Sequence, residues 1–177
     1  DIILFISTFF WYDNSGGKMK VIVVSDSHGK DSAIQAVLEQ YPQAELFLHC
    51  GDIEAEPQQY PQLVTVRGNN DIFYDYPEER VVTVGKHRIY VVHSHKFTYS
   101  RRVEQLAQKA KSLACDIVCY GHTHIAAYEV VDGVHVLNPG SLWRSRDGRG
   151  PSYAVVELEG DNVDVEFKFL PQSKSNF

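Results

Sequence analysis

The chain has 177 residues, of which 44% are hydrophobic and 23% are charged, and this composition is typical of one soluble globular domain with a core. Its formal net charge of -6 argues against non-specific binding of nucleic acid, which usually needs a basic surface, but leaves small anionic substrates open. The three cysteines include no C-x-x-C pair, so they predict reduced, buried thiols in a cytoplasmic protein rather than a disulfide framework.

The first 18 residues differ from the rest of the chain. Their apolar run, DIILFISTFFWY, is too short to span a bilayer, which takes about 20 residues, and it lacks the basic start and the cleavage site of a signal peptide. We expect Met19 to be the natural start and residues 1–18 to be an expression scar or non-native leader; a short anchor or an oligomer contact is the alternative. We expect residues 19–172 to form a single domain and residues 173–177 a C-terminal tail.

Two amphipathic helices are predicted after Met19. The first follows from apolar side chains spaced i, i+3, i+4 and i+7 from Ile34, with Asp31 or Ser32 as its N-cap and Pro42 ending it. The second is predicted over residues 101–114, where apolar side chains again fall on one helix face.

The predicted strands surround these helices. Residues 20–25, KVIVVS, form a short run rich in β-branched residues, as in a strand buried on both faces. The order of strands and helices predicts one α/β domain with a central sheet and helices outside it. The remaining predicted strands are 45–50, 63–67, 80–93 (two strands joined at Gly85-Lys86), 116–120, 126–131, 134–138 (after a turn at Asp132-Gly133), and 152–158 with 163–170, which form a hairpin around residues 160–162.

Polar side chains follow five of these strands directly. In open α/β sheets the functional site lies outside the carboxyl ends of the strands, so we expect the five clusters to converge on one rim. Each cluster alone is typical of a turn, and a lone histidine at a strand end is more often a packed or surface group than a ligand. Together they indicate one site built from oxygen and imidazole groups. The clusters are Asp26-Ser27-His28, Gly51-Asp52, Gly68-Asn69-Asn70-Asp71, His93-Ser94-His95 and Gly121-His122-Thr123-His124.

This ordered set of motifs resembles the calcineurin-like metallophosphoesterases. The pattern of that superfamily is D-x-H, G-D, G-N-H-[DE], a histidine and G-H-x-H, and the resemblance spans residues 20–141, including the loop Asn138-Pro139-Gly140-Ser141. In length the chain is similar to the small single-domain bacterial and archaeal phosphodiesterases. The resemblance implies an α/β fold, a four-layer α/β/β/α sandwich of two mixed sheets flanked by helices, with two bound metals.

The resemblance also implies a ligand set for the two ions. Asp52 would bridge them, and the surplus positive charge left after the two aspartates would favour a phosphoryl group. Mixed nitrogen and oxygen ligation without thiolate suits Mn, Fe, Zn or Ni, and we expect Mn first. By the resemblance, one ion is held by Asp26, His28, Asp52 and His124, and the other by Asp52, Asn69, His93 and His122.

The spacing of two of these histidines has a geometric interpretation. Residues i and i+2 of an extended chain point to the same side, so we expect His122 and His124 to face one site from an extended segment.

The mechanism that the resemblance implies is in-line attack of a bridging, metal-bound hydroxide on phosphorus, because metals roughly 3.5–4 Å apart can activate water and clamp the phosphate oxygens. We therefore expect a hydrolase, a metal-dependent phosphodiesterase acting on a small phosphodiester.

The chain departs from the family pattern at Asn70, where the family usually carries a histidine that protonates the leaving group or binds phosphate. An amide cannot donate a proton near neutral pH, although it can hydrogen-bond a phosphate oxygen. We assign Asn70 to catalysis and substrate binding and expect a bias toward diesters or good leaving groups. His95 is a second catalytic candidate, Arg144 is a substrate-binding candidate, and Asp71 is expected to orient a neighbouring ligand.

Three other functions are compatible with these motifs. A retromer subunit has this fold and acts by protein contact, so a non-catalytic binding module is the first rival; the presence of all seven ligand positions argues against it. The acidic charge and the length argue against a nuclease for long nucleic acid, and Asn70 argues against a phosphomonoesterase. We expect a small phosphodiester as partner, no long nucleic acid, no membrane and a cytoplasmic location, and a homo-oligomer remains open.

Overall fold

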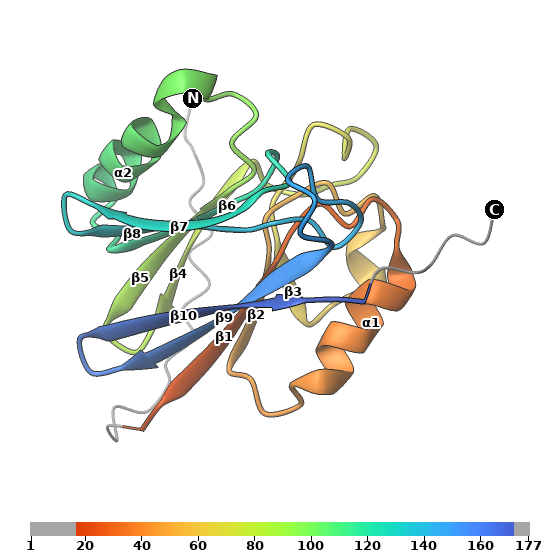
Figure 1. The fold of residues 1–177 in the computed structure, drawn as a ribbon, viewed down its shortest axis with the longest axis horizontal. Helices are drawn as coiled ribbons and strands as arrows, with labels where there is room; N and C mark the ends of the chain where they lie inside the picture. The colour runs from red at the N-terminus through yellow and green to blue at the C-terminus, as the bar shows by residue number, and fades with distance from the viewer. Residues whose placement is uncertain (1–16, 172–177) are drawn as a thin grey trace.

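The computed structural model describes residues 17–171, which fold as two five-stranded sheets, two α-helices and two short 3-10 helices (Figure 1). The predictions for residues 1–18 and 173–177 therefore fall almost wholly outside the described residues. The first sheet has the strand order β10 (Asn162–Phe169), β9 (Ser152–Glu159), β1 (Met19–Val24), β2 (Leu46–His49) and β3 (Leu63–Thr65). The second has the order β4 (Glu79–Val84), β5 (His87–Val92), β6 (Ile117–Tyr120), β8 (Val134–Pro139) and β7 (Ala126–Val131).

Both sheets are mixed, and each has a parallel centre. In the first sheet β1, β2 and β3 run parallel while β9 and β10 pair antiparallel. In the second sheet β5, β6 and β8 run parallel, and antiparallel strands β4 and β7 form the two edges. The fold class implied by the motifs, a sandwich of two mixed sheets, is confirmed. The single central sheet inferred from the strand order alone was wrong, because strand periodicity does not say which strands share a sheet.

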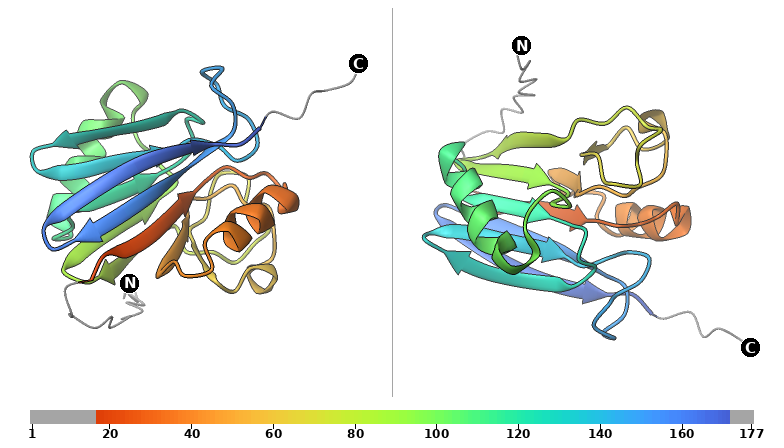
Figure 2. Two further views of the ribbon diagram at one scale, coloured as in Figure 1. Left: turned by 60° about the horizontal axis from the view of Figure 1, so that its bottom comes forward. Right: turned by 90° about the horizontal axis from the view of Figure 1, so that it is seen from above.

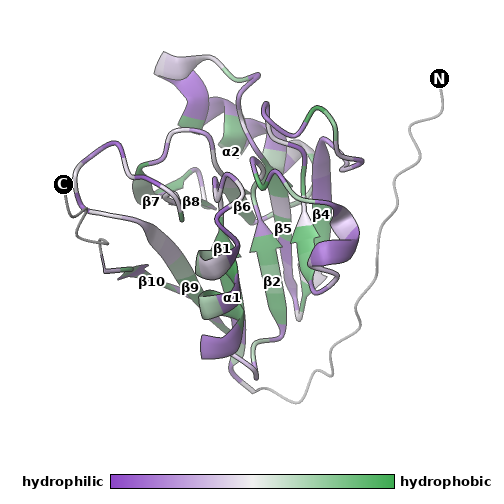
Figure 3. Cartoon of the chain, turned by 90° about the vertical axis from the view of Figure 1, so that its right-hand side faces the viewer, coloured by the Kyte–Doolittle hydropathy of each residue, from purple (hydrophilic) through white to green (hydrophobic). Residues whose placement is uncertain are grey.

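A hydrophobic core lies between the two sheets. Its side chains come from the inner faces of both, such as Val21, Val23 and Leu48 from one sheet and Val91 and Ile117 from the other, and they are almost fully buried. The strands are mostly hydrophobic in Figure 3, whereas the connecting loops are mostly hydrophilic. Burial of these apolar surfaces is the main force that holds the two sheets together.

One helix covers the outer face of each sheet, which completes the four layers (Figure 2). Helix α1 (Asp31–Gln40) buries Ile34 and Val37 against the first sheet, and α2 (Arg102–Ser112) buries Leu106 against the second. The helix predictions are confirmed, except that the N-cap of α1 is Lys30 and makes no side-chain capping bond. The expected N-cap, Asp31, lies inside the helix, where its carboxylate accepts a hydrogen bond from the Tyr60 hydroxyl at 2.7 Å.

The parallel strands of the two sheets direct their carboxyl ends to the same end of the sandwich. The loops that follow β1, β2 and β3 gather there with the loops that follow β5, β6 and β8 (Figure 1). These loops carry the five polar clusters that the sequence places after its strands. Among residues 17–171, no helix has the length and apolar character needed to cross a membrane.

The inter-sheet core can be tested at a position remote from these loops. Leu158 on β9 is 0% exposed, so Leu158→Ala should lower the free energy of unfolding by about 2–5 kcal/mol through lost apolar burial and the cavity left behind. Urea denaturation followed by circular dichroism measures this change. The control Val130→Ala, at a position 54% exposed on edge strand β7, should stay within about 0.5 kcal/mol of the unmodified protein. A loss for Leu158→Ala as small as that of the control would contradict this core.

Candidate metal centre

The loops after β1 and β2 are fastened to each other by their backbones. The Asp26 amide donates to the carbonyl of Gly51 at 3.0 Å, and the His28 amide donates to the carbonyl of Asp52 at 3.0 Å. Gly51 has φ +96°, and a Cβ at this position would lie 2.8 Å from Nδ1 of His93. Any other residue would be strained there, because φ is positive and its Cβ would collide with His93 and with the backbone of Gly68.

Five predicted ligands converge within this loop cluster. Oδ1 of Asp26 lies 3.2 Å from Nε2 of His124, which in turn lies 3.4 Å from Nε2 of His28. Oδ2 of Asp52 lies 3.4 Å from Nε2 of His93 and 3.8 Å from Nε2 of His28, so it stands between the two halves of the site. Two groups have ligand atoms within 4.8 Å of one another and could each hold an ion: Asp26, His28 and His124, and Asp26, Asp52 and His93.

The hydrogen bonds behind three of these imidazoles fix which nitrogen faces the site. Nδ1 of His28 bonds Oε1 of Glu54 at 2.6 Å, Nδ1 of His93 bonds the Cys50 carbonyl at 2.8 Å, and Nδ1 of His124 bonds the Arg144 carbonyl at 2.9 Å. Each partner is an acceptor, so each neutral ring carries its proton on Nδ1. Each Nε2 is therefore the nitrogen directed into the site, where it can ligate a metal that replaces any proton it carries.

The carboxylate of Asp26 is the clearest sign that the site suits a cation. Its side chain is 0% exposed, and Oδ2 accepts hydrogen bonds from the Ser25 hydroxyl at 2.5 Å and the His122 amide at 3.0 Å. Oδ1 is buried and has no hydrogen-bond partner among the described residues. A buried, unpartnered carboxylate oxygen is costly unless a cation faces it. The donor set of carboxylate and imidazole groups fits a divalent transition metal.

The two aspartates of this cluster are ionised at neutral pH, and the histidines beside them have shifted pKa values. Burial alone would raise the pKa of Asp26 and Asp52, but the close Nε2 atoms of His124 and His93 and their positive charge hold both pKa values below the usual range. Burial alone would lower the pKa of His93, but the two carboxylates raise it. Burial and the neighbouring charge of His93 lower the pKa of His122 to about 4, so this ring is neutral at neutral pH and available as a ligand.

The asparagines of the third cluster lie at the open side of the site and are exposed. Oδ1 of Asn69 lies 3.1 Å from Nε2 of His93. The backbone amide of Asn70 donates to Oδ1 of Asp52 at 2.8 Å, and its side-chain amide donates to Oδ2 at 2.7 Å. Asn70 therefore holds the Asp52 carboxylate on both oxygens, a role that the sequence did not indicate.

Asp71 positions the loops rather than facing the site. It is 0% exposed, and its carboxylate accepts hydrogen bonds from the backbone amides of Asp52, Gly68 and Glu54 at 2.7–2.8 Å. The expectation that Asp71 orients a neighbouring ligand agrees with these contacts, because they fix the backbone on either side of Asp52.

The last three predicted residues lie around the cluster. The ring of His122 is centred 5.2 Å from that of His93, and the ring of His95 is centred 5.5 Å from His93 and 6.2 Å from His122. Arg144 contacts the site through its carbonyl, whereas its side chain is exposed. The structure thus gathers the predicted metal ligands with Asn70 and His95, and brings Arg144 to the site by its backbone.

The expected extended segment at His122 and His124 was wrong. His122 has φ +74° and His124 has φ +59°, so the chain turns through the left-handed region at both residues. Seven of the nine non-glycine residues with positive φ in the described chain belong to the metal cluster or border it, and the seven are Asp26, His28, Asp52, Glu54, Ser94, His122 and His124. Such backbone strain, about 1–3 kcal/mol per residue, is typical of functional sites.

Three buried polar residues support the loops, although the sequence analysis assigned them no role. Ser141 donates from Oγ to the Asp26 carbonyl at 2.8 Å, and Asn138 donates to the Gly121 carbonyl at 3.1 Å. His49 accepts a hydrogen bond at Nδ1 from the Gly51 amide, so its neutral ring carries the proton on Nε2 and donates to the Ser27 hydroxyl at 3.0 Å. Only the polarity of these residues beside the clusters could have marked them.

Comparison with known proteins places this geometry in a family. Residues 19–161 match the model of the calcineurin-like phosphoesterase superfamily domain. The probable metallophosphoesterase YsnB of Bacillus subtilis is 36% identical over 153 residues, which cover 84% of this chain and 90% of that protein. The phosphodiesterase MJ0936 of Methanocaldococcus jannaschii is 28% identical over 163 residues, which cover 80% of this chain and 94% of that protein.

Solved structures agree in fold. A predicted phosphoesterase of Streptococcus pneumoniae superposes with a TM-score of 0.81 at 30% identity, covering 86% of this chain and 90% of that one. A Vps29 variant of Entamoeba histolytica superposes with a TM-score of 0.68 at 23% identity, covering 86% of this chain and all of that one, and this likeness concerns the fold alone.

Buried His49 makes the stability of the site loops depend on pH. Complete burial lowers its pKa from 6.5 to about 4, so its contribution is fully present above pH 6.5 and is lost as the pH falls toward 4. In metal-free protein, lowering the pH from 7 to 5 should cost about 2 kcal/mol of unfolding free energy through this residue. Urea denaturation of the unmodified protein and of His49→Gln at both pH values isolates the effect. Equal pH dependence in the two proteins would contradict the prediction.

Proposed function

The chain belongs to the calcineurin-like phosphoesterase superfamily, and on that premise we propose that it is a metal-dependent phosphodiesterase with a dinuclear site that hydrolyses a small phosphodiester. The observation that carries the proposal is the unpartnered, buried Oδ1 of Asp26 facing a set of imidazole Nε2 atoms. A packed core has no need of this cluster, whereas a cation can bind its carboxylate oxygen and imidazole nitrogens. The phosphodiesterase among the relatives supports the choice of a diester.

We propose that the two ions are held by the ligand set that the family motifs indicate. Asp26, His28 and His124 would hold one ion, Asn69, His93 and His122 the other, and Asp52 would bridge them. The position of Oδ2 of Asp52 between His28 and His93 supports the bridging role. When bound, two divalent ions activate water as a nucleophile and neutralise charge on the phosphate. We propose Mn as the native metal, with Fe, Zn and Ni as alternatives that accept the same donors.

The protein residues contribute by orientation and by charge. Asn70 holds the Asp52 carboxylate on both oxygens through its backbone and side-chain amides. The carbonyls behind His93 and His124 bind Nδ1 of each ring and so direct Nε2 into the site. These contacts preorganise the donors before substrate arrives, and preorganised electrostatics is usually the largest single contribution to catalysis.

We propose that Asn70 also biases the enzyme toward diesters and good leaving groups. Its amide cannot protonate a leaving oxygen, and a general acid typically contributes about 10²–10⁴-fold where protonation is needed. His95 is the nearby group that could partly replace a general acid, because its ring lies beside His93 and His122. Burial and the charge of His93 lower its pKa, which favours a neutral ring and weakens this second role. Arg144 stays a candidate for phosphate binding through its exposed guanidinium.

The rival functions have less support. A protein-binding module of the same fold would need neither the strained loops nor the convergent Nε2 atoms, and the likeness to Vps29 concerns the fold alone. A nuclease acting on long nucleic acid would be expected to carry a basic surface, whereas the net charge is -6. We therefore keep a small phosphodiester as the proposed substrate, and a cytoplasmic location and the oligomeric state stay predictions.

The enzyme proposal is tested by hydrolysis of bis-p-nitrophenyl phosphate. Metal-stripped protein should be inactive, and adding Mn²⁺ should restore activity, because the ions supply the nucleophile and the charge that the reaction needs. His122→Ala should lower that activity by roughly 100-fold or more, since it removes a ligand rather than a supporting contact. His135→Ala, a half-exposed histidine on β8 outside the site, is the matched control and should leave it unchanged.

Two outcomes would count against this proposal. Folded protein that hydrolyses no diester with Mn²⁺, Fe²⁺, Zn²⁺ or Ni²⁺ would favour a binding module that keeps its metals for structure. Elemental analysis of the loaded protein should give two ions per chain, and a single ion would remove the dinuclear part while leaving a metal-dependent hydrolase possible.

The role of Asn70 is tested by Asn70→His. This variant should raise hydrolysis of phenyl phosphate, a monoester with a poor leaving group, by roughly tenfold or more relative to bis-p-nitrophenyl phosphate, because the imidazolium can protonate the leaving oxygen. The control Asn70→Ala should weaken both reactions, since it removes an amide from Asp52, without moving their ratio. The idea fails if the ratio for Asn70→His equals that of the unmodified protein.

A further inference from the structure

Trp143 places a partly exposed indole beside the candidate metal ligands. Its ring is centred 4.8 Å from the ring of His28 and 6.1 Å from the ring of His124, and the side chain is 46% exposed. Among the described residues, no other exposed large hydrophobic side chain makes an aromatic contact with a candidate ligand. The indole therefore forms part of the wall where a bound phosphate group would meet solvent.

Hydrogen bonds anchor the backbone that carries this indole. The Trp143 amide donates to Oγ of Ser141 at 3.0 Å and to the Asp26 carbonyl at 3.3 Å. The preceding residue, Leu142, is 0% exposed, and its amide donates to the Ser25 carbonyl at 3.0 Å. The Leu142 side chain is thus buried in the core, and the Trp143 amide is bonded to the carbonyl of Asp26, a candidate metal ligand. A ring carried on an anchored backbone loses less entropy when it contacts a ligand than a ring on a free loop would.

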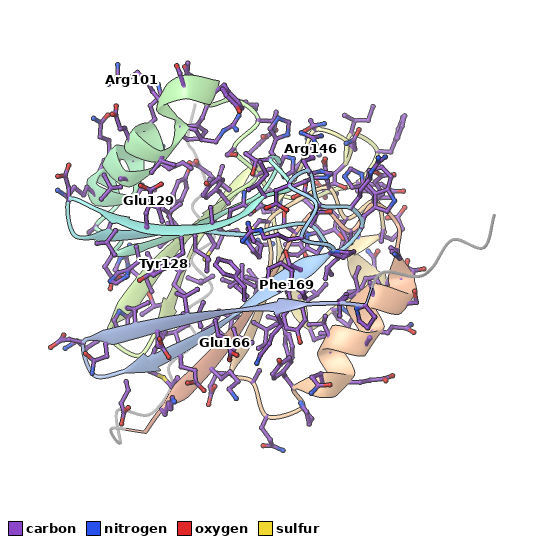
Figure 4. The ribbon with its side chains drawn as sticks, in the orientation of Figure 1. Arg101, Tyr128, Glu129, Arg146, Glu166 and Phe169 are labelled. Atoms are coloured by element: carbon purple, nitrogen blue, oxygen red, sulfur yellow. The ribbon has the colours of Figure 1, made fainter. Side chains whose placement is uncertain are left out.

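A role in packing alone explains only part of this arrangement. Contact with His28 uses one part of the indole, yet nearly half of the side chain stays open to solvent. Exposed aromatic side chains next to a phosphate site can stack planar groups such as nucleobases. This stacking depends little on which base is bound, because every base has a π face. The loop that begins at Trp143 also carries Arg144 and Arg146 (Arg146 is labelled in Figure 4), which form no ion pair among the described residues, whereas Arg149 pairs with Asp147.

We propose that Trp143 is a stacking platform and that the substrate is a phosphodiester carrying a planar aromatic group, such as a nucleobase, next to the scissile phosphate. This inference rests on the proposed phosphodiesterase function and specifies its substrate class. The phosphate would sit on the metal ligands, and the planar group would lie over the open face of the indole. A diester with an aliphatic group in that place would bind without the stacking contact.

The test compares two diesters with the same leaving group. Thymidine 5′-(p-nitrophenyl phosphate) and ethyl p-nitrophenyl phosphate both release p-nitrophenol and differ in the group retained on phosphorus. In the Mn²⁺-loaded protein, Trp143→Ala should lower kcat/KM for the thymidine diester by roughly 5- to 50-fold more than for the ethyl diester. Trp143→Phe, which keeps a ring, should retain most of the preference. Tyr128→Ala, at a 37% exposed aromatic on β7 (labelled in Figure 4), should change neither value.

A second readout does not depend on turnover. The chain has two tryptophans, Trp11 and Trp143, so in a Trp11→Phe variant the fluorescence reports Trp143 alone. Thymidine 5′-monophosphate should quench it to a greater extent than inorganic phosphate does, with both titrated to saturation. Equal quenching, or an equal loss of kcat/KM for both diesters in Trp143→Ala, would overturn the stacking role and leave the phosphodiesterase function intact. If neither diester is hydrolysed, the proposed function fails, and the fluorescence titration alone decides whether a planar group binds.

Discussion

The burial of Asp26 at the end of β1 is the constraint on which the rest of the loop architecture depends. Its amide binds the loop after β2, its carbonyl accepts from Ser141 and Trp143, and its carboxylate accepts from the His122 amide and Ser25. One residue thus joins loops from both sheets. A buried carboxylate tolerates this position only if its oxygens are paired or face a cation, so the backbone scaffold and the metal chemistry are consequences of the same burial.

Packing of the core between the sheets offsets the backbone strain of the site loops. Seven residues in and around the site hold positive φ without being glycine, and a loop free in solution would relax such angles. Each loop is anchored at its root by a strand whose apolar side chains are packed between the sheets. The rigid sandwich therefore fixes the angles, and the angles aim the ligands.

Strands and site clusters could be read from the sequence, because apolar periodicity and the polar residues that follow it are local signals. Both helices and the strands near the site appear where that periodicity places them, and Asp26, His28, Asp52, His93 and His124 meet as strand-end groups should. What the sequence did not show depends on tertiary contact. Glu54 has no mark as a partner of His28 until the fold brings it within 2.6 Å, and a backbone carbonyl behind His93 has no side-chain signature at all. The left-handed turns at His122 and His124 were missed because imidazole spacing alone suggests extended chain, whereas close packing against Asp26 decides the angle.

The partners behind the three imidazoles differ in how they respond to mutation. The acceptors for His93 and His124 are main-chain carbonyls, which every amino acid supplies, so those two rings keep their tautomer while the surrounding sequence drifts. The acceptor for His28 is the carboxylate of Glu54, the one member of the three that a single codon change can replace. A carboxylate partner makes its imidazole a stronger electron donor than an amide or hydroxyl partner would. In this fold, evolution can therefore adjust the donor strength of one half of the metal centre through residue 54 while the orientation of the other rings remains inherited from the backbone.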